Sequence, residues 1–262
     1  MHASTSPPVV LIIAGNDPSG GAGLAADMQA VTALGAHPAP VISAITVQDT
    51  VNAMRVEAIQ PQLVVQQAEA VLADMPVAAI KLGLLANTGI GEAVAQMLRA
   101  HGEIPVVLDP VLIAGGGASL AEEALIRVYL ELLLPLAAIV TPNAYESGRL
   151  APQGTDAKSR AAALLARGCQ HVLIKGADED TVDVQNFLLN HDGTQKSFSW
   201  PRLPGKHHGS GCTLASAIAA LIARHYSPLE AIEQAQRYTW DALKQGWRLG
   251  KGQIIPNRQI KP

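Results

Sequence analysis

The sequence is poor in aromatic residues and in cysteine. Only 3% of its 262 residues are aromatic, and it has two cysteines, Cys169 and Cys212. Because 48% of the residues are still apolar, the core must be filled by Ala, Val, Leu and Ile, a composition typical of a parallel sheet covered by helices. Two distant cysteines exclude a zinc ribbon and a disulfide-stapled secreted fold.

Surplus positive charge and long apolar runs are also absent. The formal net charge is -3 and no dense cluster of Lys and Arg occurs, which argues against a nucleic-acid partner. The apolar run Val9 to Ala14 is too short to span a membrane and lacks the basic flank of a signal peptide. We therefore expect a cytoplasmic protein that binds a small molecule, without a nucleic-acid or membrane partner.

Strand-like apolar runs alternate with helical patterns along the chain. The expected strands are 9–13, 40–47, 55–59, 78–82, 105–108, 137–140 and 171–174. The expected helices are 24–34, 61–73, 88–100, 120–134, a short one at Glu146, 156–167, one from the glycine loop at 209–212 to about 225, and 228–245. Residues 184–189 and 195–200 flank an Asp-Gly turn, which predicts a hairpin. The pattern predicts one α/β domain over 1–262, with 1–7 as a loose lead-in and an antiparallel edge on a mainly parallel sheet.

A glycine-rich stretch near the C-terminal end, Lys206 to Leu214, is the strongest local signal. Gly209 and Gly211 bracket Ser210 and lead into a helix, so backbone N–H groups and the helix dipole favour an anion there. Cys212 lies in the first turn of that helix, where we expect a lowered thiol pKa. The same residues also suit a loop that closes a buried helix, with Cys212 as a small apolar residue.

Other polar residues follow the predicted strands, at the sheet edge where α/β proteins bind ligands. They are Asn16, Asp17, Gln48, Asp109, Asn143, Glu146 and Lys175. Asp109, Asn143 and Glu146 offer oxygen ligands suited to magnesium, and Lys175 offers a charge for a phosphate. Cys212 could accept the proton of an attacking hydroxyl. The glycines after the first strand do not form a P-loop, since no lysine follows them, and their spacing does not give the GxGxxG dinucleotide motif.

Six segments, in chain order, form a combination typical of one family. They are AGNDPSGGAGLAAD at 14–27, TVQDT at 46–50, KLGLL at 81–85, LDPV at 108–111, TPNAYE at 141–146 and HGSGCT at 208–213. With them the chain resembles, from about Val9 to Gln245, the bacterial hydroxymethylpyrimidine/phosphomethylpyrimidine kinases of thiamine biosynthesis, which have a ribokinase-like three-layer α/β/α fold.

The resemblance implies a site that transfers a phosphoryl group from ATP to the pyrimidine and then to its monophosphate. Gln48 would read the ring edge and Asp27 would meet the hydroxymethyl arm. The rest of the pyrimidine pocket would be formed by Gly15, Thr46, Leu84 and Val111. Asp109, Asn143, Glu146 and Lys175 would surround the nucleotide phosphates, and Asp109 and Glu146 would hold Mg²⁺. Gly209, Ser210, Gly211 and Cys212 would form the anion hole, and the family's homodimer is expected.

Two departures from the family pattern weaken the positive charge near the phosphates. Gly115 to Gly117 stand where the family usually has a loop lysine, and Asp178 stands where histidine is usual after Lys175. We therefore expect the second phosphorylation to be slow relative to the first. Two other functions stay open: a kinase for pyridoxal or another hydroxymethyl heterocycle, and a pyrimidine-binding protein without turnover.

Overall fold

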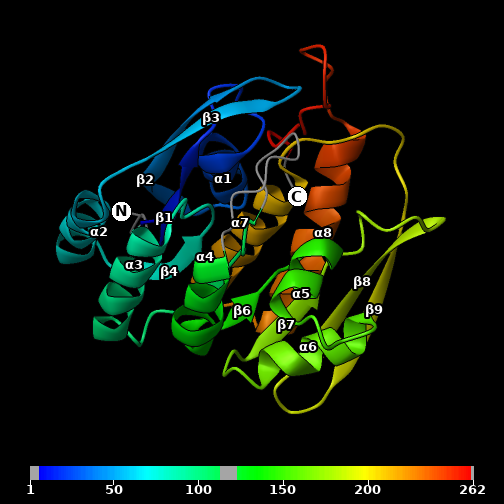
Figure 1. Ribbon diagram of the computed structural model, residues 1–262. Helices are drawn as coiled ribbons and strands as arrows, with labels where there is room; N and C mark the ends of the chain where they lie inside the picture. The colour runs from blue at the N-terminus through cyan, green and yellow to red at the C-terminus, as the bar shows by residue number, and fades with distance from the viewer. Residues whose placement is uncertain (1–5, 113–122, 261–262) are drawn as a thin grey trace, which may run out of the picture.

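A computed structural model describes residues 6–112 and 123–260, all built around one nine-stranded sheet (Figure 1). Along the sheet the strands follow the order β3-β2-β1-β4-β5-β6-β7-β8-β9. Their bounds are β1 Val9–Asn16, β2 His37–Gln48, β3 Ala53–Ala58, β4 Val77–Leu82, β5 Val106–Leu108, β6 Ile139–Val140, β7 His171–Ile174, β8 Asp183–Asn190 and β9 Gln195–Pro201. The mainly parallel sheet expected from the sequence is confirmed, since β2, β1, β4, β5, β6 and β7 pair in parallel.

Both edges of the sheet are antiparallel. The predicted hairpin is present, with β8 antiparallel to β7 and to β9. The opposite edge is also antiparallel, because β3 folds back on β2. The sequence indicated a strand there but not its direction, since β2 and β3 are separated by a short polar turn without a strong hairpin motif.

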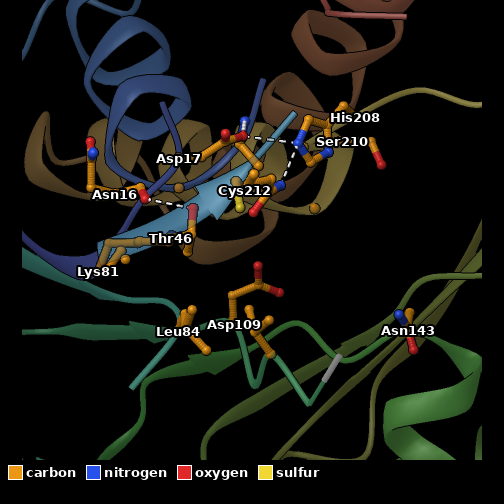
Figure 2. Close-up of a pocket in the computed structure, with 18 of the residues that line it drawn as sticks. Asn16, Asp17, Thr46, Lys81, Leu84, Asp109, Asn143, His208, Ser210 and Cys212 are labelled. Carbon is orange, nitrogen blue, oxygen red and sulfur yellow. Dashed lines mark hydrogen bonds and ion pairs between the residues drawn. The ribbon is translucent and has the colours of Figure 1, made fainter. Parts of the chain in front are cut away.

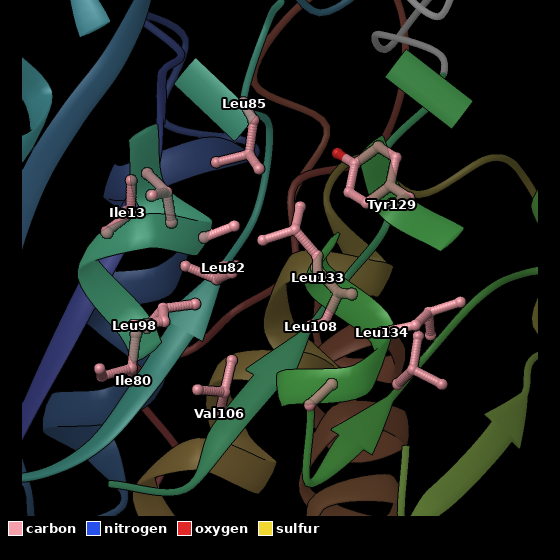
Figure 3. Close-up of a cluster of buried hydrophobic side chains, with 14 of the residues drawn as sticks. Ile13, Ile80, Leu82, Leu85, Leu98, Val106, Leu108, Tyr129, Leu133 and Leu134 are labelled. Atoms are coloured by element: carbon pink, nitrogen blue, oxygen red, sulfur yellow. The ribbon is translucent and has the colours of Figure 1, made fainter. Parts of the chain in front are cut away.

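Helices cover both faces, which gives the three-layer arrangement (Figure 1). Their bounds are α1 Gly23–Ala33, α2 Pro61–Asp74, α3 Thr88–Ala100, α4 Glu123–Val128, α5 Ala144–Leu150, α6 Ala157–Leu165, α7 Ser210–Ala223 and α8 Pro228–Lys244. The alternation of β1 separates two cores: Leu11 and Ile13 pack with α2, α3, α4 and α6, whereas Val10 and Ile12 pack with α1, α7 and α8. Figure 3 shows part of the first core, where Tyr129 lies above Leu108 and Leu133.

One predicted helix differs from the structure. Residues 120–134 were expected to form a single helix, but α4 ends at Val128 and continues as a π turn over Tyr129–Leu133 and a 3₁₀ turn over Leu134–Leu136. The start expected at Leu120 lies outside the described residues. Pro135 removes a backbone donor, which explains why regular α-helix does not continue to the end of the segment. In residues 6–112 and 123–260, no helix is both long and apolar enough to cross a membrane.

Helix α7 places the glycine stretch against the centre of the sheet. Ala215, Ala219 and Ala220 are fully buried, and these small side chains let the helix pack closely on the strands. Its N-terminus lies at the end of the sheet where the parallel strands finish. The predicted capping box at Ser227 and Glu230 starts α8, which packs on α7 and holds it in place.

Candidate active site

A pocket opens at the carboxyl ends of the parallel strands (Figure 2). Its lining includes most of the residues predicted for the site: Gly15, Thr46, Gln48, Leu84, Asp109, Val111, Asn143, Glu146, Lys175, Gly209, Ser210, Gly211 and Cys212. These residues come from segments that are distant in the sequence. The fold therefore brings together the heterocycle-reading groups, the charged groups and the anion loop that the sequence pattern indicated separately.

The loop after β1 is held by the carboxylate of Asp17, which is 4% exposed. Asp17 accepts hydrogen bonds from the backbone N–H groups of Ser19 and Ala22, at 2.9 and 2.8 Å. His208 Nε2 lies 2.9 Å from Asp17 Oδ2, which ties this loop to the anion loop. Burial alone would raise the pKa of Asp17, but the hydrogen bonds from His208 and Ser19 outweigh it and hold the pKa below its usual value.

The end of β2 forms the wall expected to read a heterocycle. The hydroxyl of Thr46 donates to the carbonyl of Asn16 at 2.9 Å, which fixes β2 against β1 at the pocket rim. Gln48 Nε2 lies 2.8 Å from His208 Nε2. The Nε2 atom of His208 therefore lies between Asp17 and Gln48; because it donates to Asp17, it has no lone pair left to accept from the Gln48 amide, and Gln48 faces the pocket beside it.

The N-terminus of α7 forms the anion site. Gly209 is the N-cap in a left-handed conformation, with φ 69°, and no side chain caps the helix. A Cβ atom at Gly209 would lie 2.1 Å from the carbonyl oxygen of Gly21, so only glycine lets the two loops approach this closely. The first N–H groups of a helix have no partner within it. Those of Ser210, Gly211 and Cys212 are thus available to a phosphate.

The thiol of Cys212 does not have the lowered pKa expected from its helix position. Burial raises the pKa of Cys212 to about 11, and the nearby carboxylates of Asp27 and Asp109 add to this effect, whereas Lys81 opposes it. The expectation of a favoured thiolate was therefore wrong, because desolvation at the pocket floor outweighs the helix end. In the ligand-free protein Cys212 carries its proton at neutral pH.

A sealed ion pair lies behind Cys212. Lys81 Nζ is 2.8 Å from Asp27 Oδ2, and both side chains are fully buried. Ser216 on α7 donates to the other carboxylate oxygen of Asp27 at 2.8 Å. Lys81 belongs to the pocket lining, whereas Asp27 does not, and the contact of Asp27 with a hydroxymethyl arm stays a prediction. Asp27 lies behind the pocket because α1 turns it toward α7.

A second ion pair borders the pocket. Lys175 Nζ lies 2.8 Å from Asp109 Oδ1, and the hydroxyl of Thr141 donates to the same oxygen at 3.1 Å. Burial alone would lower the pKa of Lys175, but the carboxylates of Asp109 and Glu146 outweigh it and keep the lysine charged. This pair follows β5 and β7, which run in the same direction on either side of β6, so the two side chains meet at one sheet edge.

Asn143 and Glu146 have a structural role as well as a place in the pocket. They form a capping box at the start of α5, in which each side chain accepts a backbone N–H of the other residue, at 2.7 and 2.8 Å. Burial raises the pKa of Glu146 to about 7; Lys175 opposes this and Asp109 adds to it. Asp178 accepts the N–H groups of Ala144 and Tyr145, so the extra carboxylate is engaged by the same helix end.

The carboxylates of Asp109 and Glu146 suit a divalent cation bound together with a nucleotide. Within residues 6–112 and 123–260, no group of three or more His, Cys, Asp or Glu side chains could hold a metal alone. Magnesium usually keeps several waters and takes one or two carboxylates plus substrate phosphates. The pKa of Glu146 is raised first by burial and further by the Asp109 carboxylate, and a cation between the two would favour their ionised forms. The residues present therefore fit Mg²⁺ bound as its nucleotide complex.

Three residues near the pocket were not predicted from the sequence. Lys81 and Gln253 line it, and Arg258 lies beneath both glycine loops. Lys81 had a detectable signal, because a lysine in the apolar run at 78–82 must find a buried partner. Gln253 and Arg258 had none, since their C-terminal segment lacks helical or strand periodicity. The predicted lysine-free loop at Gly115 to Gly117 lies outside the described residues.

Comparison with known proteins finds relatives over most of the chain. Residues 17–257 match the family model described as phosphomethylpyrimidine kinase. The chain is 40% identical over 250 residues to the hydroxymethylpyrimidine/phosphomethylpyrimidine kinase of Salmonella typhimurium, covering 92% of this chain and 94% of that protein. It is 38% identical over 251 residues to the Escherichia coli enzyme of the same name, covering 94% of each.

Solved structures share the whole fold. The pyridoxal kinase of Staphylococcus aureus in complex with AMP-PCP and pyridoxal superposes with a TM-score of 0.88 at 28% identity, covering 97% of this chain and 94% of that one. The phosphomethylpyrimidine kinase of Clostridium difficile gives a TM-score of 0.77 at 29% identity, covering 89% of this chain and 98% of that one. The ribokinase-like fold and the family resemblance are therefore confirmed, and the chain belongs to the phosphomethylpyrimidine kinase family.

Proposed function

We propose that this protein transfers the γ-phosphoryl group of ATP to the hydroxymethyl group of 4-amino-5-hydroxymethyl-2-methylpyrimidine, and then to the monophosphate, in thiamine biosynthesis. One observation carries the proposal: Gln48, positioned to read a ring edge, and the open N-terminus of α7 line the same pocket, with Cys212 in it as well. The match of residues 17–257 to the family model and 40% identity to a kinase of this name support it.

The charged side of the pocket is proposed to hold the nucleotide. Lys175 and the N–H groups of Ser210 to Cys212, which line the pocket, would neutralise the phosphates. Asp109 and Glu146 would hold Mg²⁺, which supplies charge neutralisation for the transferred group. Phosphoryl transfer needs mostly positioning and charge, so the protein's main contribution is the fixed geometry of these groups.

The proton of the attacking hydroxyl is proposed to go to Cys212. Because the pKa of Cys212 is about 11 in the ligand-free protein, only a small fraction of molecules holds the thiolate at neutral pH. That fraction is a strong base, because a thiol with a high pKa gives a strongly basic thiolate. A rate that depends on the thiolate must then increase with pH.

A pyridoxal kinase is the second candidate. It is favoured by one observation, that the superposition on the Staphylococcus aureus pyridoxal kinase, with a TM-score of 0.88, exceeds the 0.77 found for a phosphomethylpyrimidine kinase. Both substrates carry a hydroxymethyl group on a six-membered ring. The donor and acceptor pattern presented to Gln48 distinguishes them.

A steady-state assay tests both candidates and the binding protein without turnover. ATP, Mg²⁺ and each heterocycle are supplied separately, and monophosphate and diphosphate products are resolved. We expect kcat/KM to be highest for the pyrimidine, with the second step slower than the first. Gln48→Leu should weaken pyrimidine binding by about 1–3 kcal/mol and leave the KM for ATP near that of the parent. A preference for pyridoxal, or binding without product, would overturn the proposal.

We further propose a cytoplasmic homodimer formed through the β2–β3 edge. Ile45, Val47 and Met54 are exposed there by 48%, 51% and 64%, which is unusual for apolar side chains on neighbouring strands. A second copy would cover them. Sedimentation of the parent and of a Val47→Asp/Met54→Asp variant measures this directly, and a parent that sediments as a monomer contradicts it.

A further inference from the structure

Arg258 is buried beneath the anion site although it lies near the C-terminal end of the chain. Its side chain is 1% exposed, which makes it the largest fully buried side chain of the described residues. The carbonyl oxygen of Arg258 accepts a hydrogen bond from the hydroxyl of Tyr238 at 2.8 Å, so α8 fixes the backbone at this point. An arginine is almost never fully buried unless it is paired, so its partners need an explanation.

The guanidinium joins the two glycine loops. Nη2 donates to the carbonyl oxygen of Gly21 at 2.5 Å and to that of His208 at 3.3 Å. Nη1 donates to the carbonyl oxygen of Gly20 at 3.4 Å, and Nε donates to the hydroxyl of Thr213 in α7 at 2.8 Å. One planar fork therefore contacts the loop after β1, the anion loop and the first turns of α7.

The partners of Arg258 carry no full negative charge. All four acceptors are neutral oxygens. Two acidic residues also have a charge that reaches the guanidinium: Asp27, which is paired with Lys81 at 2.8 Å, and Asp17, which lies 2.9 Å from His208 Nε2. Within the described residues the guanidinium forms no ion pair. The protein thus keeps a positive charge out of water, directly below a helix end that is open to anions.

The hydrogen bond from Arg258 to the His208 carbonyl also orients the peptide that joins His208 to Gly209. The carbonyl and the N–H of a trans peptide point in opposite directions. Because the His208 carbonyl points to Arg258, the N–H of Gly209 points away from the guanidinium. Gly209 itself lines the pocket. The arginine therefore fixes the backbone that must meet the transferred phosphate.

We propose that Arg258 is a positioning residue for phosphoryl transfer, which locks the loop after β1 onto the anion loop and holds a positive charge, without a directly paired carboxylate among the described residues, beneath the site of the bound phosphate. The predicted effect of Arg258 on turnover rests on the proposed function. Its predicted effect on anion binding does not, because the binding of inorganic pyrophosphate can be measured without a pyrimidine.

The test compares Arg258→Met and Arg258→Lys with Arg224→Met. Arg224 is a matched control, since it also donates to a backbone carbonyl, that of Leu34 at 3.0 Å, but at the opposite end of α7. For Arg258→Met we expect kcat to fall by about 10²-fold, the scale of losing one preorganised group for the developing charge. Arg258→Lys should recover about tenfold of this, because it keeps the charge and loses the fork. Arg224→Met should keep the parent kcat.

The second readout is the increase in Tm that pyrophosphate produces. We expect the parent and Arg224→Met to share this increase, Arg258→Lys to keep part of it, and Arg258→Met to lose most of it. If Arg258→Met does not fold, the proposal is tested by the kcat of Arg258→Lys and by the recovery of kcat when guanidinium ion is added to Arg258→Gly.

Two results would overturn the proposal: an Arg258→Met variant with the parent kcat and the parent response to pyrophosphate, or a lysine variant and a guanidinium rescue that restore nothing. A parent enzyme that responds to pyrophosphate but does not phosphorylate the pyrimidine would instead contradict the proposed function alone.

Discussion

Two buried lysine–aspartate pairs lie on either side of the pocket floor, and they differ in their access to the pocket. In both, Nζ lies 2.8 Å from a carboxylate oxygen. The side chains of Lys81 and Asp27 are fully buried, whereas Lys175 keeps 11% of its side chain exposed. The first pair has Ser216 of α7 as its third member, and the second has Thr141 at the end of β6.

Because the two lysine–aspartate pairs differ in their access to the pocket, we expect them to have different roles. Lys81 borders the pocket, but both members of its pair are fully buried and Asp27 is not in the lining, so this pair fixes β4 to α1 and α7 and its loss should destabilise the fold. A pair at the pocket edge can share its lysine with an incoming phosphate and its carboxylate with a metal ion. The comparison therefore predicts that the Lys81 pair governs stability and the Lys175 pair governs turnover.

The largest effect is expected at the sealed pair. Lys81→Met leaves the Asp27 carboxylate buried without a cation, which should lower the free energy of unfolding by about 3–5 kcal/mol. Urea unfolding measures this change. The double variant Lys81→Met/Asp27→Leu is the control, because it removes both charges and should recover most of the loss. A single variant as stable as the parent would mean that this pair does not hold the fold.

At the open pair, Lys175 and Asp109, we expect a large loss of turnover and a smaller loss of stability. Lys175→Met should lower kcat by about 10²–10³, since it removes one fixed positive group from the phosphate site. The loss in unfolding free energy should be smaller than for Lys81→Met, because Thr141 still donates to Asp109 and the pocket gives that carboxylate access to water. Steady-state kinetics and urea unfolding of the same preparation test the two halves. Equal losses of stability in the Lys81 and Lys175 variants would contradict the proposed difference between the two pairs.

The sequence predicted the residues of the open pair better than those of the sealed one. Asp109 and Lys175 each follow a strand, and parallel strands bring such residues to one edge whatever the details of packing. The partner of Lys81 could not be read in this way. Asp27 lies inside a helix, and whether it faces the pocket or α7 depends on the rotation of α1 against the sheet, which no local pattern encodes.

The same limit explains the error at Cys212. Its place in the first turn of a helix was correct, and that position alone favours the thiolate. The pKa is decided instead by how much water the assembled pocket admits, which depends on loops from both ends of the chain. Arg258 was missed for a related reason, because its partners are backbone carbonyls and no residue type marks them.

Cys212 lies near both lysine–aspartate pairs, and the pH dependence of its thiol gives a third prediction. Since its pKa is about 11, the thiolate fraction should grow about tenfold for each pH unit between 7 and 9. We expect the kcat of the parent to increase with that slope, and Cys212→Ala to give a low rate without it. The rate of alkylation of Cys212 by iodoacetamide should follow the same titration. A kcat that is flat over this range, with alkylation still rising, would show that the thiol positions the substrate without taking its proton.

The smallest effect is expected at Glu146, which borders the open pair. Its pKa is raised from 4.5 to about 7, first by burial. Between these two values the folded protein binds more protons at this group than the unfolded chain, so the contribution of Glu146 to stability declines as pH rises and is least favourable above 7. Glu146→Gln keeps an oxygen that can accept the Asn143 N–H but cannot ionise.

The variant should therefore be more stable than the parent at pH 8, by no more than the ~3 kcal/mol that a shift of about 2.5 pKa units allows, and this difference should become small below pH 5. Urea unfolding at pH 5, 7 and 8 measures it. The same carboxylate is the proposed ligand of Mg²⁺, so the parent should need more Mg²⁺ as pH falls below 7, because the ion must displace the proton of Glu146. Glu146→Gln should lose that pH dependence. Parallel stability curves for the two proteins would show that Glu146 is already ionised in the pocket, and that the metal site is not restrained by a proton.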